Sequence, residues 1–348
     1  MASTDFVLGG TVIDVDKAFA PNDCLRNRPS RSGPVPNRPQ RLTVIANPFS
    51  GNGRGKSALI TANQVFAEAG IKVTVLKTEH EKHACQLARS VRPEDTDGVV
   101  VIGGDGTLQE VLSGLIDAGL AETITVGLIA GGTGNSVAQS LGLMDSVVAA
   151  KIIAEGFSCS IDVGKCSVVH MPGASPTNYV FVNLIGLGIV VDAGVSAESL
   201  RFLGKVRYDI AGLWHIIKGK TRDFALDIDG QSLQGDISVI LIQNNKHMGS
   251  GLRVAPGAAM DDGSFDLVLL FNQGRCATLS MFNKLKRSGS HIFSKFVKYG
   301  LAKKIVITPA TPQIFTIDGE LFDAFSRMEI EVVPKAIKLF ASPEPKLC

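Results

Sequence analysis

The feature that most constrains the fold is a unit that occurs three times, in which a short apolar run leads into a glycine-rich turn and then into a helical stretch. The apolar runs are residues 42–46, 99–102 and 123–129, and their helical stretches are 57–69, one after the second turn and one after Asn135. A further strand at 72–77 and a helix near 82–91 lie between the first two units. Strands that alternate with helices indicate a mostly parallel sheet covered on both faces. We therefore predict a three-layer α/β lobe.

The pattern changes after Ser160, where strand follows strand with turn signals between them and one helical insertion at Ala197–Lys218. A chain of 348 residues exceeds what a single core usually serves. We predict an N-terminal tail over 1–40, proline-rich from residue 21 and flexible, an α/β lobe over 41–158, a mainly β sandwich lobe over 159–341, and a C-terminal tail over 342–348.

The overall composition excludes several classes of protein. The net charge of only +2 argues against a dedicated nucleic-acid binder. Six cysteines are scattered without a C-x-x-C pair, which is typical of free thiols in a reducing compartment. No stretch reaches the roughly 18 apolar residues of a membrane span. These observations predict a soluble, cytoplasmic protein.

Each glycine-rich turn follows a strand of the predicted parallel sheet. They read Asn-Pro-Phe-Ser-Gly-Asn-Gly at 47–53, Gly-Gly-Asp-Gly-Thr-Leu-Gln-Glu-Val at 103–111 and Gly-Gly-Thr-Gly-Asn-Ser at 131–136. Ligands of open α/β sheets bind beyond the carboxyl ends of the strands, and amides at helix starts favour phosphate. The glycines around Asp105 leave this carboxylate free to approach a phosphate or a hydroxyl. The three turns together predict phosphate binding.

In this order the motifs resemble the catalytic region shared by diacylglycerol kinases, sphingosine kinases, ceramide kinases and bacterial relatives. The resemblance covers roughly residues 41–341 and continues through the segments 78–79, 83–84, 161–164, 201–207, 261–263 and 318–320. It implies an α/β nucleotide-binding lobe followed by a β-sandwich lobe, as in NAD kinases and diacylglycerol kinases. It also implies an ATP-dependent kinase that transfers the γ-phosphate to a lipid hydroxyl.

The resemblance implies roles for individual residues. Asp105 and Glu320 are the two candidates for the catalytic base, and the choice between them stays open. The residues expected to bind ATP are Asn47, Ser50, Gly51, Thr78, Gly103, Gly104, Gly106, Thr107, Glu110, Gly132, Thr133, Gly134, Asn135, Arg201, Arg207 and Gly319. Asp105, Asp162 and Asp318 are candidates for holding Mg²⁺, which prefers oxygen ligands. Asp261 and Asp262 are candidates for a structural ion, with an exposed turn as the alternative.

Two positions bear on activity and on the choice of lipid. Many diacylglycerol kinases have aspartate where this chain has Ser136, so a metal ligand is expected to be missing, although sphingosine kinases also lack it. Sphingosine kinases recognise their amino alcohol with an aspartate at the position that aligns with Gly194, whereas Asp192 lies two residues away. Diacylglycerol and a sphingoid base such as sphingosine both remain open as acceptors.

The expected partners are the lipid substrate and the membrane that contains it, with peripheral association and no nucleic acid; a homodimer is left open. The segment Phe282–Lys304 mixes cations with aromatic residues and is interpreted either as a solvated connection or as a contact with anionic lipid. Trp214, Ile210 and Ile217 predict one helix face, directed into a core or a lipid pocket. The alternatives to a lipid kinase are an NAD kinase and a non-catalytic lipid-binding relative.

Overall fold

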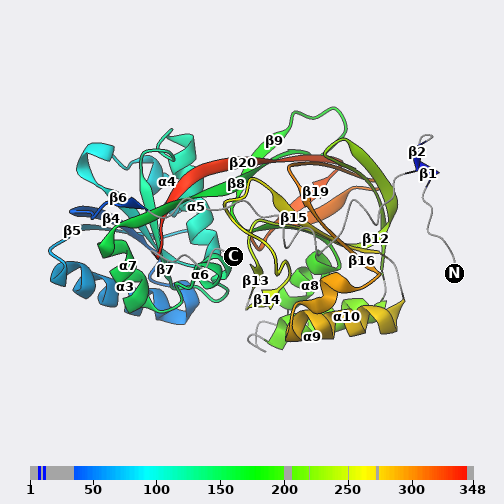
Figure 1. The fold of residues 1–348 in the computed structure, drawn as a ribbon, viewed down its shortest axis with the longest axis horizontal. Coiled ribbons are helices and arrows are strands. Elements are labelled where there is room, and N and C mark those ends of the chain that lie inside the picture. Colours follow the sequence, from blue (N-terminus) through cyan, green and yellow to red (C-terminus); the bar gives the residue numbers. More distant parts are fainter. Residues whose placement is uncertain are drawn as a thin grey trace.

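A computed structural model describes residues 7–8, 11–12, 35–199, 206–218, 220–249, 251–271 and 274–342. Two lobes lie side by side, and helices cover both faces of the sheet in the first lobe (Figure 1). The second lobe consists mainly of antiparallel strands, with a group of helices against one side. The predicted order of an α/β lobe followed by a β-sandwich lobe is confirmed.

The first lobe is built on four parallel strands in the order β7-β6-β4-β5. Its elements are β4 (Arg41–Ala46), α3 (Ser50–Glu68), β5 (Lys72–Lys77), α4 (His83–Arg89), the 3₁₀ turn η1 (Pro93–Asp95), β6 (Gly98–Gly103), α5 (Asp105–Asp117), β7 (Thr125–Ala130), α6 (Ser136–Leu141) and α7 (Ser146–Glu155). All six residues of β6 are buried, as expected for a strand that is covered on both faces. The glycine-rich turns therefore emerge together at the carboxyl edge of this sheet.

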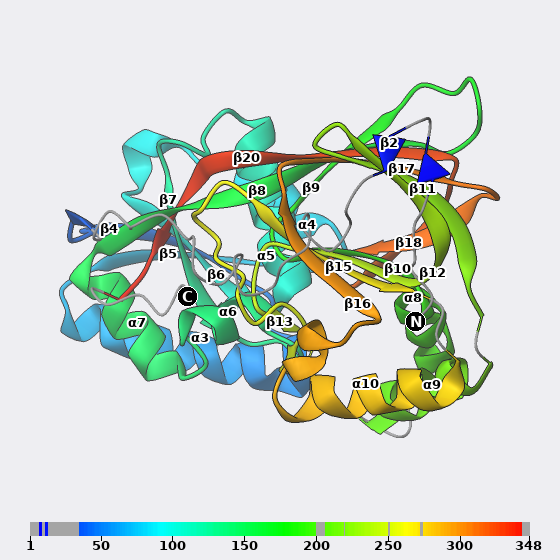
Figure 2. The same ribbon diagram turned by 45° about the vertical axis from the view of Figure 1, so that its right-hand side comes forward.

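The second lobe packs two layers of strands around a core and places helices outside one of them. Its elements are β9 (Thr177–Phe181), β10 (Leu184–Gly188), α8 (Ile189–Glu198), α9 (Val206–Lys218), β11 (Arg222–Ile228), β12 (Gln231–Gln243), β13 (His247–Met248), β14 (Leu252–Arg253), β15 (Phe265–Phe271), α10 (Arg275–Arg287), the 3₁₀ turn η3 (Ser290–Phe293), β16 (Val297–Ala302), β17 (Lys304–Pro309), β18 (Gln313–Ile317) and β19 (Glu320–Phe325). The neighbours β10, β12, β15 and β16 form the floor on which α8, α9 and α10 lie (Figure 2).

Two long strands join the lobes. β8 (Phe157–Val169) and β20 (Arg327–Phe340) pair antiparallel over most of their length and run from one lobe into the other (Figure 1). β20 pairs with β17 at one end and, in parallel, with β7 at the other. Ile337, Leu339 and Phe340 consequently belong to the hydrophobic core of the first lobe. β20 thus brings the chain back into the first lobe.

The structure departs from the sequence interpretation in three places. The predicted insertion at 197–218 is replaced by α8, which begins eight residues earlier, and by α9. Most of the segment interpreted as a connection at 282–304 belongs to α10, η3 and β16. Within the predicted N-terminal tail, β1 (Val7–Leu8) pairs with β2 (Thr11–Val12), and β3 (Val35–Pro36) pairs with β8. None of the helices that the structure describes is long and apolar enough to cross a membrane.

Candidate active site

The three glycine-rich turns touch one another at the carboxyl edge of the parallel sheet. A methyl group added to Gly104 would lie 3.2 Å from the Cα of Gly132, and one added to Gly51 would lie 2.2 Å from the carbonyl oxygen of Gly131. The amides of Gly131 and Gly132 both donate to the carbonyl of Gly103. Only glycine allows backbones to approach so closely, so the turns form one continuous cradle.

The turn between β4 and α3 is shaped by its own polar side chains. Asn47 accepts from the Phe49 amide at 3.1 Å, and the Ser50 hydroxyl donates to the Asn47 carbonyl at 2.9 Å. Gly51, Asn52 and Gly53 follow with φ values of 58°, 60° and 87°, and the regular part of α3 begins after them. Two glycines among these three residues make the left-handed turn accessible.

Asn135 shapes the turn between β7 and α6 in a similar way. Its side chain accepts from the Gly132 amide at 2.9 Å and donates to the Gly132 carbonyl at 2.8 Å. Its φ of 54° is in the left-handed region, which asparagine tolerates better than most residues. Thr133 and Gly134 remain on the open side of this turn, and both line the cavity described below.

Asp105 begins α5 and reaches across to the start of α6. Its carboxylate accepts from the amides of Ser136 and Val137 at 2.8 and 3.2 Å. Burial raises the pKa of Asp105, while these two amides and the Ser136 hydroxyl act in the opposite direction. Asp105 is therefore a fixed carboxylate, more basic than an exposed aspartate.

Asp318 and Glu320 lie on the tight turn between β18 and β19. Asp318 accepts three backbone hydrogen bonds, from Val182, Asn183 and Leu184, at 2.8–3.0 Å. Burial raises the pKa of Asp318 to about 7, and the negative charge of Asp105 contributes in the same direction, whereas the three amides favour the ionised form. This carboxylate thus anchors the turn, which continues through Gly319 with a φ of 95°.

Glu320 approaches the same region from the other side of the turn. One of its carboxylate oxygens lies 3.2 Å from the position that a Cβ on Gly106 would occupy. Glu320 keeps an exposed side chain, but partial desolvation by its neighbours raises its pKa, and the charges of Glu110 and Glu81 raise it further while Lys82 lowers it. The two candidate bases therefore lie on either side of the first turn of α5.

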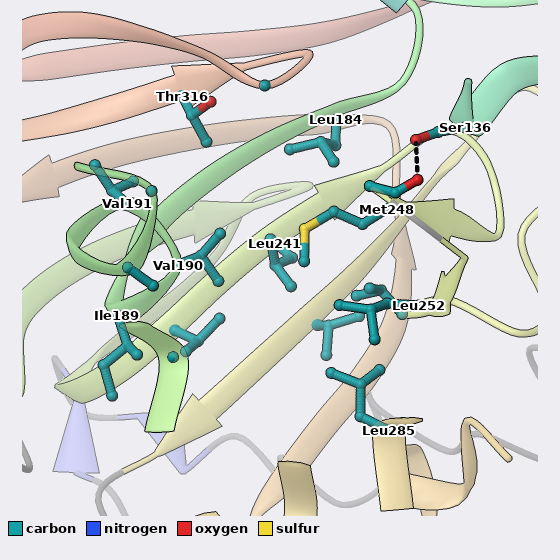
Figure 3. A pocket seen from close by; sticks show the side chains of 18 of the residues that line it. Ser136, Leu184, Ile189, Val190, Val191, Leu241, Met248, Leu252, Leu285 and Thr316 are labelled. Carbon is teal, nitrogen blue, oxygen red and sulfur yellow. Dashed lines mark hydrogen bonds between the residues drawn. The ribbon is translucent and has the colours of Figure 1, made fainter. Parts of the chain in front are cut away.

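A cavity of about 940 Å³ extends from this region into the second lobe. Its volume is at the upper end of the range of about 300–1,000 Å³ that small-molecule sites occupy. Gly104, Asp105, Ser136, Asn183 and Asp318 line its polar end. Most of the remaining wall is apolar, as the side chains of Ile189, Val190, Leu241, Leu252 and Leu285 illustrate in Figure 3.

The apolar wall is formed on one side by β10, β12, β15 and β16 and on the other side by α8, α9 and α10. Figure 3 shows side chains of α8 facing those of β12, with Ser136 at one margin of the cavity, where its hydroxyl donates to the Gly249 carbonyl at 3.5 Å. His291 is 95% buried in the wall, and its burial lowers the pKa to about 4. The ring is therefore neutral at pH 7, and the charged residue that lines this part of the wall, among those described, is Lys286 of α10.

Comparisons with known proteins agree with this geometry. Residues 41–166 match the family model described as the diacylglycerol kinase catalytic domain, and residues 183–341 match the YegS C-terminal NAD kinase beta sandwich-like domain. The two models together cover both lobes. The chain belongs to the diacylglycerol kinase and sphingosine kinase superfamily.

The superfamily members that resemble this chain are distant. Sphingosine kinase 1 of Arabidopsis thaliana is 26% identical over 321 residues. This match covers 78% of this chain and 65% of that protein, so the chain spans slightly less than two thirds of this relative. Diacylglycerol kinase of Bacillus subtilis (strain 168) is 27% identical over 285 residues, which cover 81% of this chain and 90% of that protein. A diacylglycerol kinase structure from Bacillus anthracis str. Sterne has a TM-score of 0.72 at 23% identity, covering 88% of this chain and 99% of that one. This last likeness concerns the fold.

Of the expected metal ligands, Asp105 and Asp318 both line the polar end of the cavity, whereas Asp162 does not line it. Asp162 is buried and accepts from the amides of Gly263 and Lys335 at 2.7 Å each, which ties β8 to β20. Asp262 accepts from the Ser264 amide within the same turn. Across the described residues, no group of three or more histidine, cysteine, aspartate or glutamate side chains could hold a metal ion. Asp105, Asp162 and Asp318 therefore do not fit a Mg²⁺ ion that the protein alone would bind.

Other expected nucleotide contacts have structural partners. Glu110 accepts from the Lys82 and Ala84 amides at 3.2 and 3.1 Å and so supports the start of α4. Thr107 lies directly beneath Gly103, and the buried Thr78 donates its amide to Ala46. Arg201 lies outside the described residues, and Arg207 is in α9 with a side chain that the structure does not describe.

The structure adds residues that sequence reasoning did not identify. Asn183 lines the polar end of the cavity, and its side-chain oxygen accepts from Asn245 at 2.5 Å. The side-chain oxygen of Asn245 in turn accepts from the backbone amide of His247. These two hydrogen bonds determine the orientation of both asparagine side chains, and the amino group of Asn183 points away from Asn245. No local motif marks Asn183, because the partner of its side chain lies 62 residues further along the chain.

Proposed function

We propose that this protein is an ATP-dependent lipid kinase whose acceptor is a neutral lipid, diacylglycerol in the first place. The observation that carries the proposal is the apolar cavity that ends at the Asp105 carboxylate, next to the glycine cradle. Such a cavity accommodates hydrocarbon chains, while its polar end brings a lipid hydroxyl towards bound phosphates. Membership in the superfamily supports ATP as the phosphate donor.

In this mechanism the glycine cradle holds the phosphates of ATP, which arrives with its own Mg²⁺. The lipid hydroxyl oxygen attacks the γ-phosphorus while the bond from that phosphorus to the bridging oxygen breaks, and ADP leaves. Asp105 accepts the hydroxyl proton, because it lines the cavity whereas Glu320 does not. Catalysis of phosphoryl transfer depends mainly on such positioning and on a suitably placed carboxylate.

A neutral acceptor is favoured because the cavity offers no carboxylate for an ammonium group where α8 lines it. Gly194 lines the cavity, and a Cβ added there would have nothing within 4 Å. Asp192 accepts two hydrogen bonds from Arg222, at 2.7 and 2.8 Å, and its charge is neutralised by this nearly buried ion pair. A sphingoid base would thus lose the charged partner that its ammonium needs.

The apolar wall also disfavours NAD as the acceptor, since a dinucleotide would bring a diphosphate and two riboses into it.

The decisive experiment measures transfer of radiolabelled γ-phosphate from Mg-ATP to detergent-dispersed diacylglycerol, monoacylglycerol, ceramide and sphingosine, with NAD as a control. We expect diacylglycerol to be labelled most rapidly. Label on sphingosine alone would overturn the acceptor assignment, and no label on any lipid would support the non-catalytic alternative.

The raised pKa of Asp105 predicts how activity depends on pH. A base acts in its ionised form, so activity is lost as the pH falls through the pKa of the base. Because burial raises the pKa of Asp105, this loss is expected at a higher pH than the value of about 3.9 for an exposed aspartate. Profiles of kcat/KM against pH, with circular dichroism at each pH to verify folding, would test this. A profile that stays flat down to pH 4 in a folded enzyme would contradict it.

We also propose that the protein meets its lipid at a membrane surface, with which it associates peripherally from the cytoplasm. The acceptor is insoluble in water, and its cavity lies in a lobe whose outer helices combine apolar and basic side chains.

A further inference from the structure

The outer face of α9 is unusually apolar for a helix at a protein surface. Ile210, Leu213, Trp214 and Ile217 follow one another at helical spacing and are 40–55% exposed. The opposite face of the same helix contributes Gly212 and Ile216 to the wall of the cavity. The helix therefore presents apolar groups on both sides, whereas a helix that covers a core normally has a polar outer face.

Basic residues surround this apolar stripe. α10 packs beside α9, and its exposed positions include Lys284, Lys286 and Arg287, while Leu279 on the same helix is 46% exposed. α10 itself contains four lysines and arginines and neither aspartate nor glutamate. For a chain with a net charge of only +2, this is a pronounced local excess of positive charge.

The single tryptophan belongs to the same stripe. The Lys218 ammonium lies 5.3 Å from the centre of the Trp214 ring. Tryptophan flanked by lysine is suited to the boundary between hydrocarbon and headgroups, where the indole is half immersed and the ammonium reaches the phosphates. The assignment of Trp214, Ile210 and Ile217 to a core or a lipid pocket was wrong, because these side chains point outwards.

We propose that the outer face of α9 and α10 is the surface with which this protein docks onto an anionic phospholipid bilayer. The α9–α10 face comprises Ile210, Leu213, Trp214, Ile217 and Leu279 with the cations Lys218, Lys284 and Arg287. This inference rests on the proposed function, since it identifies where a lipid kinase meets its substrate. The inner sides of both helices line the cavity, so docking brings the bilayer within one helix diameter of the acceptor site.

The charge of the face distinguishes a bilayer from a second copy of the chain. Two copies that joined through this face would bring like charges together, which destabilises an interface. An anionic bilayer attracts each lysine or arginine near its surface, and apolar side chains of an interfacial helix enter the headgroup boundary. An anionic bilayer thus interacts with both the cations and the apolar side chains of the α9–α10 face.

The experiment measures partition of the 348-residue chain into vesicles of phosphatidylcholine with 0 or 30% phosphatidylglycerol, in the absence of ATP and of any acceptor. We expect binding to require phosphatidylglycerol and to weaken as salt is added. Trp214→Glu should lower the partition coefficient at least tenfold. The double variant Lys284→Gln/Arg287→Gln should lower it about 25-fold, from roughly fivefold for each cation.

Met171 provides a matched control, because it is 69% exposed and belongs to the connection between β8 and β9. These two strands lie on the side of the lobe opposite to α9 and α10 in both views (Figures 1 and 2). Met171→Glu should bind vesicles like the wild type. If Trp214→Glu binds as tightly as Met171→Glu, or if gel filtration shows a dimer that Trp214→Glu dissociates, the proposal is overturned.

A second measurement separates docking from catalysis. With a short-chain diacylglycerol below its critical micelle concentration, Trp214→Glu should keep kcat/KM within about twofold of the wild type, since Trp214 does not line the cavity. With long-chain diacylglycerol embedded in vesicles, the same variant should lose at least tenfold. Anion-dependent vesicle binding in a protein that phosphorylates no lipid would refute the proposed function alone and leave the docking surface intact.

Discussion

Asparagine in place of Asp105 is expected to lower kcat for lipid phosphorylation by roughly 10²–10⁴, the usual contribution of a positioned base. Asp105 lines the polar end of the cavity, and burial raises the pKa of its carboxyl. Asparagine has nearly the same shape but cannot accept the hydroxyl proton. The measurement is single-turnover transfer of labelled phosphate to a short-chain diacylglycerol, which separates chemistry from product release.

The variant also has a structural cost that the experiment must take into account. The Asp105 carboxylate accepts from two amides at the start of α6, and the asparagine side chain has only one oxygen. A buried amide left without a partner costs about 1–3 kcal/mol, so we expect a lower melting temperature in a folded protein.

Glu320→Gln is the matched control, since it removes the other candidate base without losing a hydrogen bond to α6. We expect it to retain much more activity than Asp105→Asn, because Glu320 does not line the cavity. Full activity in Asp105→Asn together with a large loss in Glu320→Gln would assign the base to Glu320 instead.

The nucleotide lobe was predictable from sequence because its signals are local. Each strand, turn and helix of the β4–α3, β6–α5 and β7–α6 units lies within about 30 residues, and the glycines mark the points of close approach. The alternation of strands and helices then implies a parallel sheet whose carboxyl ends meet. Even so, the sequence did not show that the side chains of Asn135 and Glu110 accept hydrogen bonds from backbone amides.

The acceptor side was much less predictable, because its determinants are distant in sequence. Asp318 is held by amides 134–136 residues away, and Asp192 is neutralised by Arg222, 30 residues further along. The helical periodicity of α10 was overlooked because its many lysines suggested a solvated connection. In fact Met281, Phe282 and Leu285 supply an apolar face towards the cavity. The buried side and the charged side of α10 can be assigned only when the strands that pack against this helix are known.

The sequence predicted an inward direction for Trp214 because α9 has two apolar faces. An apolar stripe at helical spacing normally faces a core, and for α9 the sequence contains two such faces. Gly212 and Ile216 occupy the inner one, which leaves the larger residues outside. Which of the two apolar faces of α9 lines the cavity depends on how the helix packs against the rest of the lobe, and the local sequence does not contain this information.

Introducing a carboxylate at Gly194 should change which lipid the enzyme prefers. Gly194 lines the cavity on α8, and an added Cβ would have open space around it, so Gly194→Asp should fold and even gain helix propensity. The new carboxylate could pair with the ammonium of a sphingoid base. Hydrogen bonds to charged groups contribute about 1.5–3 kcal/mol, which corresponds to roughly 10- to 150-fold in the ratio of kcat/KM for sphingosine to that for diacylglycerol.

Gly194→Asn separates charge from size in this experiment. Asparagine fills nearly the same volume and forms hydrogen bonds, but it has no charge, so its preference ratio should stay within a few fold of the wild-type ratio. If Gly194→Asn shifts the ratio as much as Gly194→Asp does, the effect is steric and the charge argument fails. If neither variant shifts it, the lipid headgroup does not reach α8. In the expected outcome, a single missing carboxylate and the ion pair that occupies Asp192 together account for selection of a neutral lipid.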